Sequence, residues 1–266
     1  MNQEFIARHW YAHVYEQFEN HTHDVEFFLG ILREETNGVP QNILEAACGG
    51  GRISIPLARA GHNVTGFDAD EHMLLRCYRR MKDIPNITCY RANAVSSDWG
   101  KNFDVVVMAG NILINIESEM DYARAQETFI RKAAEALRPG GFLLMDYDRH
   151  SEASAIKTFN RLGESSYFNG TDDLGTTGRT VGFGGVYDPV SRICTGAGHM
   201  ELTLNNGQRF ILPETWHKHI PSQAQVYDWL AAAGFTVEKT YKNYTHEPLA
   251  EDESEYVKAT LWARKN

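Results

Sequence analysis

The sequence predicts an α/β protein with one mostly parallel sheet of seven strands and a smaller antiparallel sheet inserted before the last elements. From residue 42 onward, short apolar segments alternate with amphipathic ones, which is the pattern of βαβ units. Between residues 179 and 219, three stretches of alternating polarity are separated by turn residues, which indicates hairpins. A chain of 266 residues that is 42% hydrophobic is long enough for one large core with a small elaboration.

The elements follow in order. Aromatic and aliphatic side chains at helical spacing predict two helices within residues 4–35, interrupted near Asn20-His21-Thr22. The predicted strands of the main sheet are 42–47, 63–67, 86–90, 103–109, 141–146, 235–242 and 256–263. The predicted helices between them are 51–60, 70–82, 118–137 and 222–233. We expect Arg138-Pro139-Gly140-Gly141 to end the third of these helices and Gly234 to cap the last.

The inserted sheet is predicted to have three strands, at 179–188, 191–204 and 208–219, and Asn205-Asn206-Gly207 is a strong hairpin signal. The chain therefore divides into four predicted segments, which are an N-terminal helical segment at 1–38, an α/β core at 39–150, the antiparallel insertion at 151–221, and the C-terminal part of the core at 222–266.

Charge and cysteine content exclude several classes of protein. The formal net charge of −9, without any basic run, argues against nucleic acid and against an anionic membrane surface. The N-terminus has no leader-like pattern, and no segment approaches the roughly 20 apolar residues of a membrane span. The four cysteines (Cys48, Cys77, Cys89 and Cys194) have no spacing typical of disulfides or a zinc cage. We expect a soluble, cytoplasmic protein without a metal.

A glycine-rich turn follows the first predicted strand of the core. Gly49 and Gly51 lie between this strand and a helix, where glycine lets the backbone approach a ligand and leaves the N–H groups of the helix accessible. Asp68 ends the next strand, where a carboxylate can accept hydrogen bonds from both hydroxyls of a ribose. This register predicts a nucleotide site. The alternative is a tight turn without a ligand, in which Asp68 caps the helix that starts at Asp70.

Two residues indicate which kind of nucleotide is bound. A dinucleotide fingerprint has a third Gly or Ala where this chain has Ser54. Glu45, four residues before Gly49, would repel a diphosphate and suits a ligand that carries an ammonium group.

The segments Glu45-Ala46-Ala47-Cys48-Gly49-Gly50-Gly51 and Gly66-Phe67-Asp68-Ala69-Asp70 resemble motifs I and II of class I S-adenosylmethionine-dependent methyltransferases. The resemblance implies a Rossmann-like doubly wound fold and S-adenosylmethionine as the cofactor, with S-adenosylhomocysteine as its product. It also implies cofactor contacts along the core, at Glu45, Ala46, Gly49, Gly51, Asp68, Ala69, Met73, Asn93, Ala94, Ala109 and Asn111. On pattern alone, Met73 is equally well an ordinary helix-core residue.

The segment 103–111 and the three-stranded insertion, which ends near Trp216, resemble the glycine N-methyltransferase group. In that group the insertion covers the active site, and the Asn that matches Asn111 faces the transferring methyl group. The alternative for Asn111 is a turn-stabilising side chain. The resemblance also makes the N-terminal helices a lid, which would bring Tyr11 and Tyr15 to the cofactor or substrate. A core stripe is the alternative for these two residues.

One departure from the glycine-methylating relatives concerns the substrate. Those relatives have Asp-x-Arg after the fifth strand, whereas this chain has Asp146-Tyr147-Asp148-Arg149. Arg149 can still serve from a position displaced by one residue. Alternatively, Asp146 and Asp148 share one face of the strand and hold a cationic amine. Asp148 can also cap the segment that begins at Ser151.

Two histidines of the insertion, His217 and His219, share a strand face. We expect His217 to act as a base. A metal site would need a further ligand, for which His199 or Glu201 is conceivable.

The sequence therefore predicts a methyltransferase that acts on a small, amino-bearing molecule and forms an N-methyl bond. The alternatives are an O- or C-methyltransferase, a non-catalytic module that binds the cofactor, and a dinucleotide oxidoreductase. The pattern leaves open whether the protein is a monomer or a homo-oligomer.

Overall fold

The computed structural model describes residues 2–116, 118–250 and 255–266. The chain forms two compact units, and each is discontinuous in sequence. The larger unit consists of Thr22–Ser151 and Pro221–Asn266. The smaller unit consists of the residues up to His21 and Glu152–Ile220. The two predicted N-terminal helices are therefore divided between the units. Within the described residues, none of the helices is both long and apolar enough to cross a bilayer.

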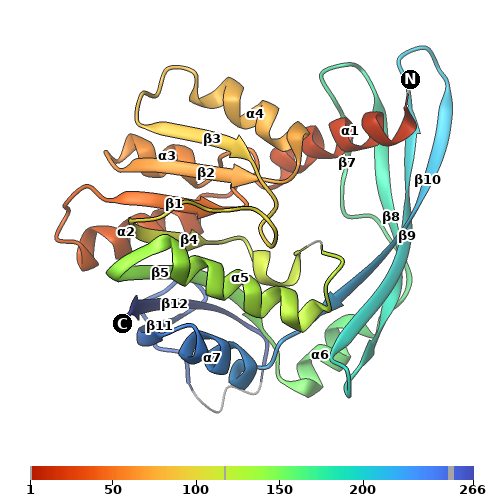
Figure 1. The fold of residues 1–266 in the computed structure, drawn as a ribbon. Helices are drawn as coiled ribbons and strands as arrows, with labels where there is room; N and C mark the ends of the chain where they lie inside the picture. The colour runs from red at the N-terminus through yellow and green to blue at the C-terminus, as the bar shows by residue number, and fades with distance from the viewer. Residues whose placement is uncertain (1, 117, 251–254) are drawn as a thin grey trace. The chain divides into compact units, whose positions relative to one another are not determined.

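The larger unit is built on a seven-stranded sheet with the order β11-β12-β5-β4-β1-β2-β3 (Figure 1). Strands β1 to β5 are parallel to one another, and β12 runs antiparallel to both β5 and β11. The strands are β1 Asn42–Ala46, β2 Asn63–Asp68, β3 Ile87–Arg91, β4 Phe103–Met108, β5 Leu137–Arg149, β11 Phe235–Lys242 and β12 Val257–Lys265. The strand order reverses between β1 and β4, and ligands of open α/β sheets bind at such a switch point, beyond the carboxyl ends of the strands.

Helices cover both faces of this sheet, because the side chains of a buried parallel strand alternate between two apolar faces. Leu44 and Val106 belong to the hydrophobic core that contains α5 and α7, whereas Ile43 and Val105 belong to the core on the opposite face, with α2, α3 and α4. The helices of this unit are α2 His23–Glu35, α3 Ser54–Arg59, α4 Glu71–Met81, the short 3₁₀ helix η1 Ile112–Ile114, α5 Tyr122–Ala136 and α7 Gln223–Ala232. The doubly wound fold is thus confirmed.

Side-chain hydrogen bonds cap the starts of α4 and α7. The Asp70 carboxylate accepts hydrogen bonds from the backbone N–H groups of His72 and Met73 and thereby starts α4. Ser222 and Gln225 form a capping box at the start of α7.

The smaller unit packs one helix against an antiparallel sheet with the strand order β10-β9-β8-β6, and β7 pairs with β8. Trp10 of α1 is fully buried, and its indole N–H donates to the Gly170 carbonyl at 3.1 Å. The elements are α1 Gln3–Phe18, α6 Glu152–Phe159, β6 Leu162–Ser165, β7 Asn169–Thr171, β8 Thr177–Asp188, β9 Ile193–Thr203 and β10 Arg209–His219.

Three features differ from the sequence-based expectations. The inserted sheet has five strands among the described residues and not three, because the short β6 and β7 add to β8. The second difference is at Arg138-Pro139-Gly140-Gly141, which does end α5 but lies within β5, since that strand begins at Leu137. The third is α6, which is not among the predicted helices.

Candidate active site

The turn after β1 has an alternating backbone conformation. Ala47, Gly49 and Gly51 all have positive φ angles, of 59°, 52° and 78°. Gly51 could not carry a side chain, because a Cβ there would lie 2.8 Å from the Cys77 Sγ. A Cβ added to Gly49 would have the Met73 Cε of α4, at 3.8 Å, as its nearest neighbour. The absence of a side chain at Gly49 therefore leaves space beside Met73.

Asp68 connects this turn to the end of β2. Its two carboxylate oxygens accept hydrogen bonds from the backbone N–H groups of Gly49 and Asp70, each at 2.8 Å. Burial raises the pKa of the Asp68 carboxyl. A carboxylate has about four lone-pair sites, so two hydrogen bonds leave acceptor capacity for the hydroxyls of a ligand.

Glu45 is a residue of β1, close to the turn in sequence. Its side chain is buried and accepts a hydrogen bond from the Ser54 hydroxyl at the start of α3. Burial raises the pKa of the Glu45 carboxyl to about 8. Arg52, which follows the turn, is half-buried, and its guanidinium makes a bidentate ion pair with Asp24, with both N–O distances at 2.7 Å.

The remaining predicted cofactor residues of the larger unit lie at the carboxyl ends of β1–β4. Asn93 uses its side-chain oxygen locally, accepting hydrogen bonds from the backbone N–H groups of Val95 and Ser96. Ala94 is half-buried, and its carbonyl accepts the Trp99 indole N–H. Ala46 and Ala109 are buried, whereas Ala69 is exposed.

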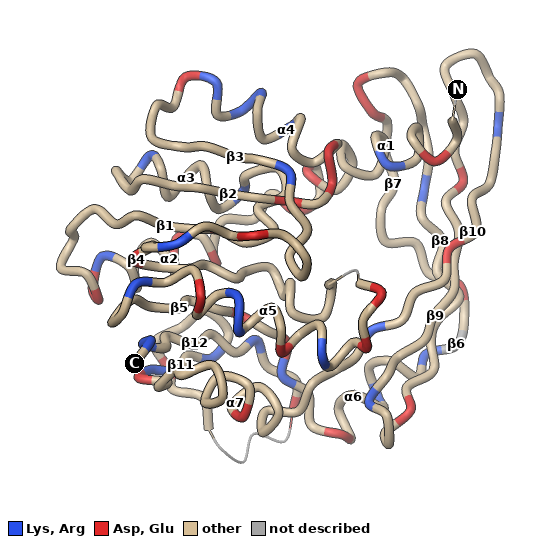
Figure 2. Tube along the Cα trace, in the orientation of Figure 1, with Lys and Arg blue, Asp and Glu red and all other residues tan. Residues whose placement is uncertain are grey.

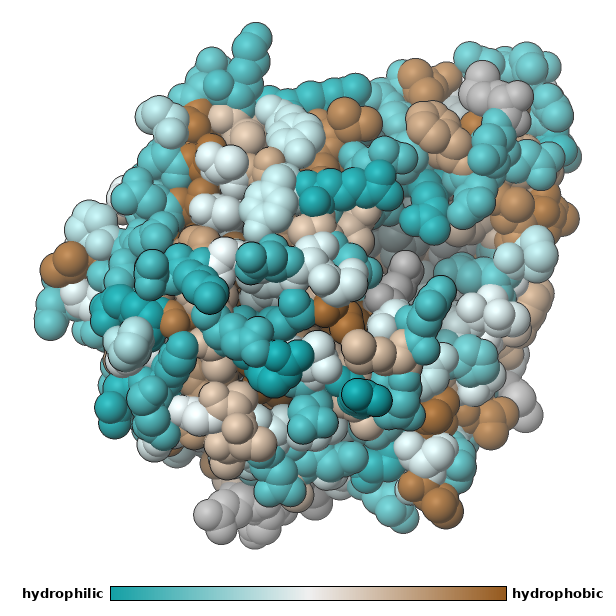
Figure 3. Space-filling model, in the orientation of Figure 1, coloured by the Kyte–Doolittle hydropathy of each residue, from teal (hydrophilic) through white to brown (hydrophobic). Residues whose placement is uncertain are grey.

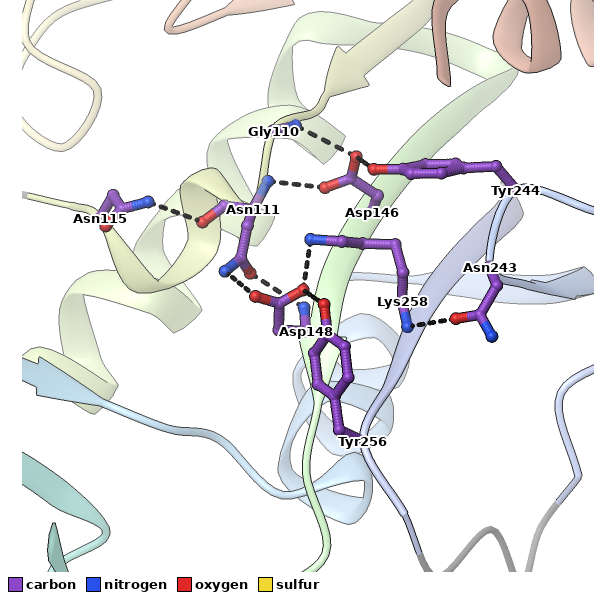
Figure 4. A network of polar contacts seen from close by, with 9 residues as sticks. All are labelled: Gly110, Asn111, Asn115, Asp146, Asp148, Asn243, Tyr244, Tyr256 and Lys258. Atoms are coloured by element: carbon purple, nitrogen blue, oxygen red, sulfur yellow. Dashed lines mark hydrogen bonds and ion pairs between the residues drawn. The ribbon is translucent and has the colours of Figure 1, made fainter. Parts of the chain in front are cut away.

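A second cluster of polar groups joins the end of β4 to the end of β5 (Figure 4). Asn111, in a left-handed conformation with φ of 58°, donates its backbone N–H to Asp146 at 2.7 Å and its side-chain N–H to Asp148 at 2.6 Å. Its side-chain oxygen accepts the backbone N–H of Asp148 at 2.9 Å. The structure thus brings together three predicted site residues and fixes the orientation of the Asn111 side chain.

The two carboxylates of this cluster differ in exposure. Asp146 is fully buried, accepts two backbone N–H groups and the Tyr244 hydroxyl, and has a pKa raised by burial. The Asp148 side chain is 20% exposed and pairs with Lys258. Asp148 is therefore the carboxylate of the cluster that a ligand can reach.

Three residues of this cluster carry no signal in the sequence. Tyr244 donates to Asp146 at 2.9 Å, Tyr256 donates to Asp148 at 3.1 Å, and Lys258 forms the ion pair with Asp148 (Figure 4). Burial, with the adjacent carboxylate as a second cause, raises the pKa of both phenols, so they act as neutral donors.

Arg149 contacts the start of α7. Its side chain is buried, and its Nε donates to the Gln223 side-chain oxygen at the start of α7.

The predicted site residues of the smaller unit contact other residues of that unit. Tyr11 and Tyr15 lie beside Phe168, with ring centroids 5.5 and 5.8 Å from it. His217 is exposed and contacts the Thr195 hydroxyl at 3.0 Å. In the β9–β10 register His217 pairs with Thr195, four residues along β9 from His199, so these two histidines do not converge on a common ion.

Comparison with known proteins bears on the class of enzyme and on the fold. A family model described as a methyltransferase domain matches residues 43–141. The putative methyltransferase YqeM of Bacillus subtilis (strain 168) is 27% identical over 220 residues, which cover 82% of this chain and 83% of that protein. The sugar N-methyltransferase KedS8 from Streptoalloteichus sp. ATCC 53650 shares the fold at a TM-score of 0.70 and 15% identity, over 100% of this chain and 94% of that one.

The chain is thus an S-adenosylmethionine-dependent methyltransferase, with a methyltransferase domain at residues 43–141. Two shorter matches concern the acceptor. A ubiquinone biosynthesis O-methyltransferase of Rhizobium leguminosarum bv. trifolii (strain WSM2304) is 31% identical over 120 residues, 44% of each chain. The glycine N-methyltransferase of Rattus norvegicus is 27% identical over 151 residues, 53% of this chain and 50% of that protein. The methyltransferase thus spans about half or less of the length of these two relatives.

S-adenosylmethionine is the cofactor of the methyltransferase, and the turn fits it. The space at Gly49, which a Cβ would fill, lies between the turn and Met73. The Asp68 carboxylate that fixes the turn retains acceptor capacity for hydroxyls.

Proposed function

We propose that this methyltransferase transfers a methyl group to the amine nitrogen of a small molecule. The observation that carries the proposal is Asp148, a partly exposed carboxylate held at the end of β5 by Asn111, Tyr256 and Lys258. This position is at the carboxyl edge of the sheet, where open α/β folds bind ligands. The matches to glycine and sugar N-methyltransferases support a nitrogen acceptor.

The proposed cofactor site follows the carboxyl ends of β1, β2 and β3. Gly49 and Gly51 allow close approach of the backbone, and Asp68 accepts the ribose hydroxyls. Met73 and the Asn93–Ala94 pair flank the adenine in this proposal. Glu45 acts indirectly, because it is buried and fixes the start of α3 through Ser54. When bound, S-adenosylmethionine supplies an electrophilic methyl group on a sulfonium centre.

The polar cluster then positions and prepares the acceptor. Asn111 is fixed by four hydrogen bonds to Asp146, Asp148 and Asn115, so its side chain is oriented before substrate binds. Asp148 attracts the amine as an ammonium ion. Lys258 beside it favours loss of the ammonium proton to solvent, because a neighbouring like charge disfavours the charged form. The neutral amine is the form that can attack a methyl carbon.

The buried position of Asp146 changes the role that the sequence favoured for it. Its oxygens accept three hydrogen bonds and its side chain has no exposed surface, so we assign it to positioning Asn111 and not to holding the amine. Arg149 is likewise buried against Gln223, so we do not assign it to a substrate carboxylate. Contact of Tyr11, Tyr15 and His217 with cofactor or substrate remains a proposal from the sequence.

An O-methyltransferase is the second candidate, because the Rhizobium relative has that activity in its name. Incubation of the full chain with S-adenosylmethionine and a panel of small amines, amino sugars and phenols separates the two. We expect S-adenosylhomocysteine and an N-methylated product with at least one amine. Methylation of phenols without any amine product would overturn the proposal, and binding of cofactor without turnover across the panel would favour a non-catalytic module.

Asp148→Asn tests the role of the carboxylate. Loss of a hydrogen bond to a charged group costs about 1.5–3 kcal/mol, so we expect kcat/KM for the amine to fall about 10- to 100-fold, with unchanged affinity for S-adenosylhomocysteine. Asp228→Asn, on the exposed face of α7, is the matched control and should leave kcat/KM unchanged. An Asp148→Asn enzyme as active as the wild type would contradict the assignment.

A further inference from the structure

Three of the four cysteines meet behind the glycine turn, although they are far apart in the sequence. Cys48 belongs to the turn, Cys77 to α4 and Cys89 to β3. All three are buried, and their sulfur atoms lie within 4.8 Å of one another, with Cys77 and Cys89 at 3.3 Å. The sequence spacing gave no sign of this cluster, because strand pairing and the packing of α4 bring the residues together.

Two glycines clear the space that these sulfur atoms occupy. A Cβ on Gly66 of β2 would lie 2.9 Å from the Cys48 Sγ and 3.1 Å from the Cys89 Sγ. A Cβ on Gly51 would lie 2.8 Å from the Cys77 Sγ. Any side chain at either position would therefore displace a sulfur, so the local backbone is shaped around the three thiols.

The dimensions suit a single metal ion. Metal–sulfur bonds to thiolates are about 2.3 Å long, and three sulfurs in a plane around one ion then lie about 4.0 Å apart. This separation falls between the shortest sulfur–sulfur contact of 3.3 Å and the 4.8 Å limit of the group. Among the described residues, the group gains no fourth ligand atom from His, Cys, Asp or Glu.

Ligand number and type select the ion. Thiolates are soft ligands that favour Cu⁺, Zn²⁺ and iron–sulfur clusters, but structural Zn²⁺ is almost always four-coordinate. We propose that Cys48, Cys77 and Cys89 form a three-coordinate site for a soft monovalent cation of the Cu⁺ class.

Metal binding requires the thiolate form of each cysteine, so the thiol protons pass to solvent as the three sulfur–metal bonds form.

A bound metal ion would link the glycine turn after β1, through Cys48, to α4 and β3. Cys48 lies directly between Ala47 and Gly49, the residues with positive φ angles. The site is nevertheless distinct from the proposed acceptor site, because Asn111 and Asp148 follow β4 and end β5. Metal binding can thus be measured without substrate or cofactor.

The test is an anaerobic titration of the reduced full chain with Cu⁺ in competition with a chromophoric Cu⁺ chelator. We expect one Cu⁺ per chain, near-ultraviolet sulfur-to-copper absorption, and three sulfur neighbours by X-ray absorption. Affinity should fall at least 100-fold in Cys77→Ser and in Cys48→Ser. Cys194→Ser is the matched control, since Cys194 is a buried cysteine of β9 in the smaller unit, and it should bind like the wild type.

Three results would overturn the proposal: wild-type binding no tighter than that of Cys77→Ser, equal loss in Cys194→Ser, or a nitrogen- or oxygen-containing metal shell. If the serine variants fail to fold, thiol alkylation of the wild-type chain decides the question. Cu⁺ should then slow alkylation of Cys48, Cys77 and Cys89 but not of Cys194, whereas equal rates with and without Cu⁺ would refute the site.

Discussion

Ala47 occupies a backbone conformation that disfavours its side chain. Its φ angle of 59° is in the left-handed region, which costs a residue with a Cβ about 1–2 kcal/mol. We therefore expect Ala47→Gly to raise the free energy of unfolding by about 1 kcal/mol in urea denaturation. Ala46→Gly is the control, because Ala46 is a buried strand residue without a positive φ and should destabilise on substitution. A destabilised Ala47→Gly variant would contradict this account of the turn.

Glu45 gives the fold a pH dependence that can be measured. Burial raises the pKa of its carboxyl from 4.5 to about 8. Between these values the native state holds a proton that the unfolded chain has lost, so the native state is favoured at low pH and its stability falls as pH rises towards 8. Glu45→Gln removes this contribution. As pH rises from 5 to 8, we expect the free energy of unfolding of the variant to increase by more than about 1 kcal/mol relative to that of the wild type.

Thermal unfolding of both proteins across pH 5–9 checks this prediction. Glutamine keeps an acceptor for the Ser54 hydroxyl, so the comparison changes the charge and retains the hydrogen bond. Parallel stability curves for the two proteins would show that the carboxyl does not titrate in this window.

Single residues were predictable only where a local pattern marks them. The glycine turn and Asp68 were found because strand, turn and acidic residue stand in fixed order along the chain. Asn111, Asp146 and Asp148 were also predicted as site residues, and their meeting follows from the pairing of Met108 with Met145. Tyr244 and Lys258 lie about a hundred residues further on. Only the antiparallel pairing of β12 with β5 brings Lys258 to Asp148.

Among the elements, the pairing of β8 with β9 requires a glycine at position 198. A Cβ on Gly198 would lie 2.4 Å from the Val181 backbone carbonyl, which cannot move without disturbing the pairing of the two strands. We expect Gly198→Ala to destabilise the protein by about 1–3 kcal/mol in denaturant unfolding. Gly30→Ala is the counterpart, since Gly30 lies inside α2 with nothing within 4 Å of its added Cβ. Gly30→Ala should stabilise by about 0.5–1 kcal/mol, and the prediction fails if both variants change stability in the same direction.

Elements with strong periodicity were predictable, and elements defined by their partners were not. The sequence predicted β1–β4 and β8–β10 to within two residues at each end, because their polarity patterns extend over the whole strand. The strands β6 and β7 have four and three residues, in and near a segment rich in Gly, Ser, Thr, Asn and Asp, and their strand character comes from pairing with β8. The β5 strand begins early because Leu137 pairs with Phe103, across a Pro-Gly-Gly sequence that ordinarily indicates a turn.

At the scale of the whole molecule, the charge distribution agrees with a small-molecule acceptor. The net charge is −9, and Figure 2 shows acidic and basic residues interspersed over most elements, with one basic group, Arg76, Arg79, Arg80 and Lys82, in and just after α4. The face shown in Figure 3 has hydrophobic residues in scattered patches among hydrophilic ones. Binding to a phosphate backbone instead requires clustered Lys and Arg.

The chain passes between its two units three times, at residues 21–22, 151–152 and 220–221, and all proposed cofactor residues of the core lie in the larger unit. A ligand that binds only the native state stabilises it, by about 2.7 kcal/mol at a hundred times Kd. We expect S-adenosylhomocysteine to slow amide hydrogen exchange most at residues 47–51, 68–73 and 93–95.

Asp68→Asn should weaken the binding about 10- to 100-fold and remove this protection at the same ligand concentration, because the variant loses a charge-assisted acceptor. Asp83→Asn, at an exposed position after α4, should retain it. Protection spread evenly over the sheet, or equal in the two variants, would place the cofactor elsewhere.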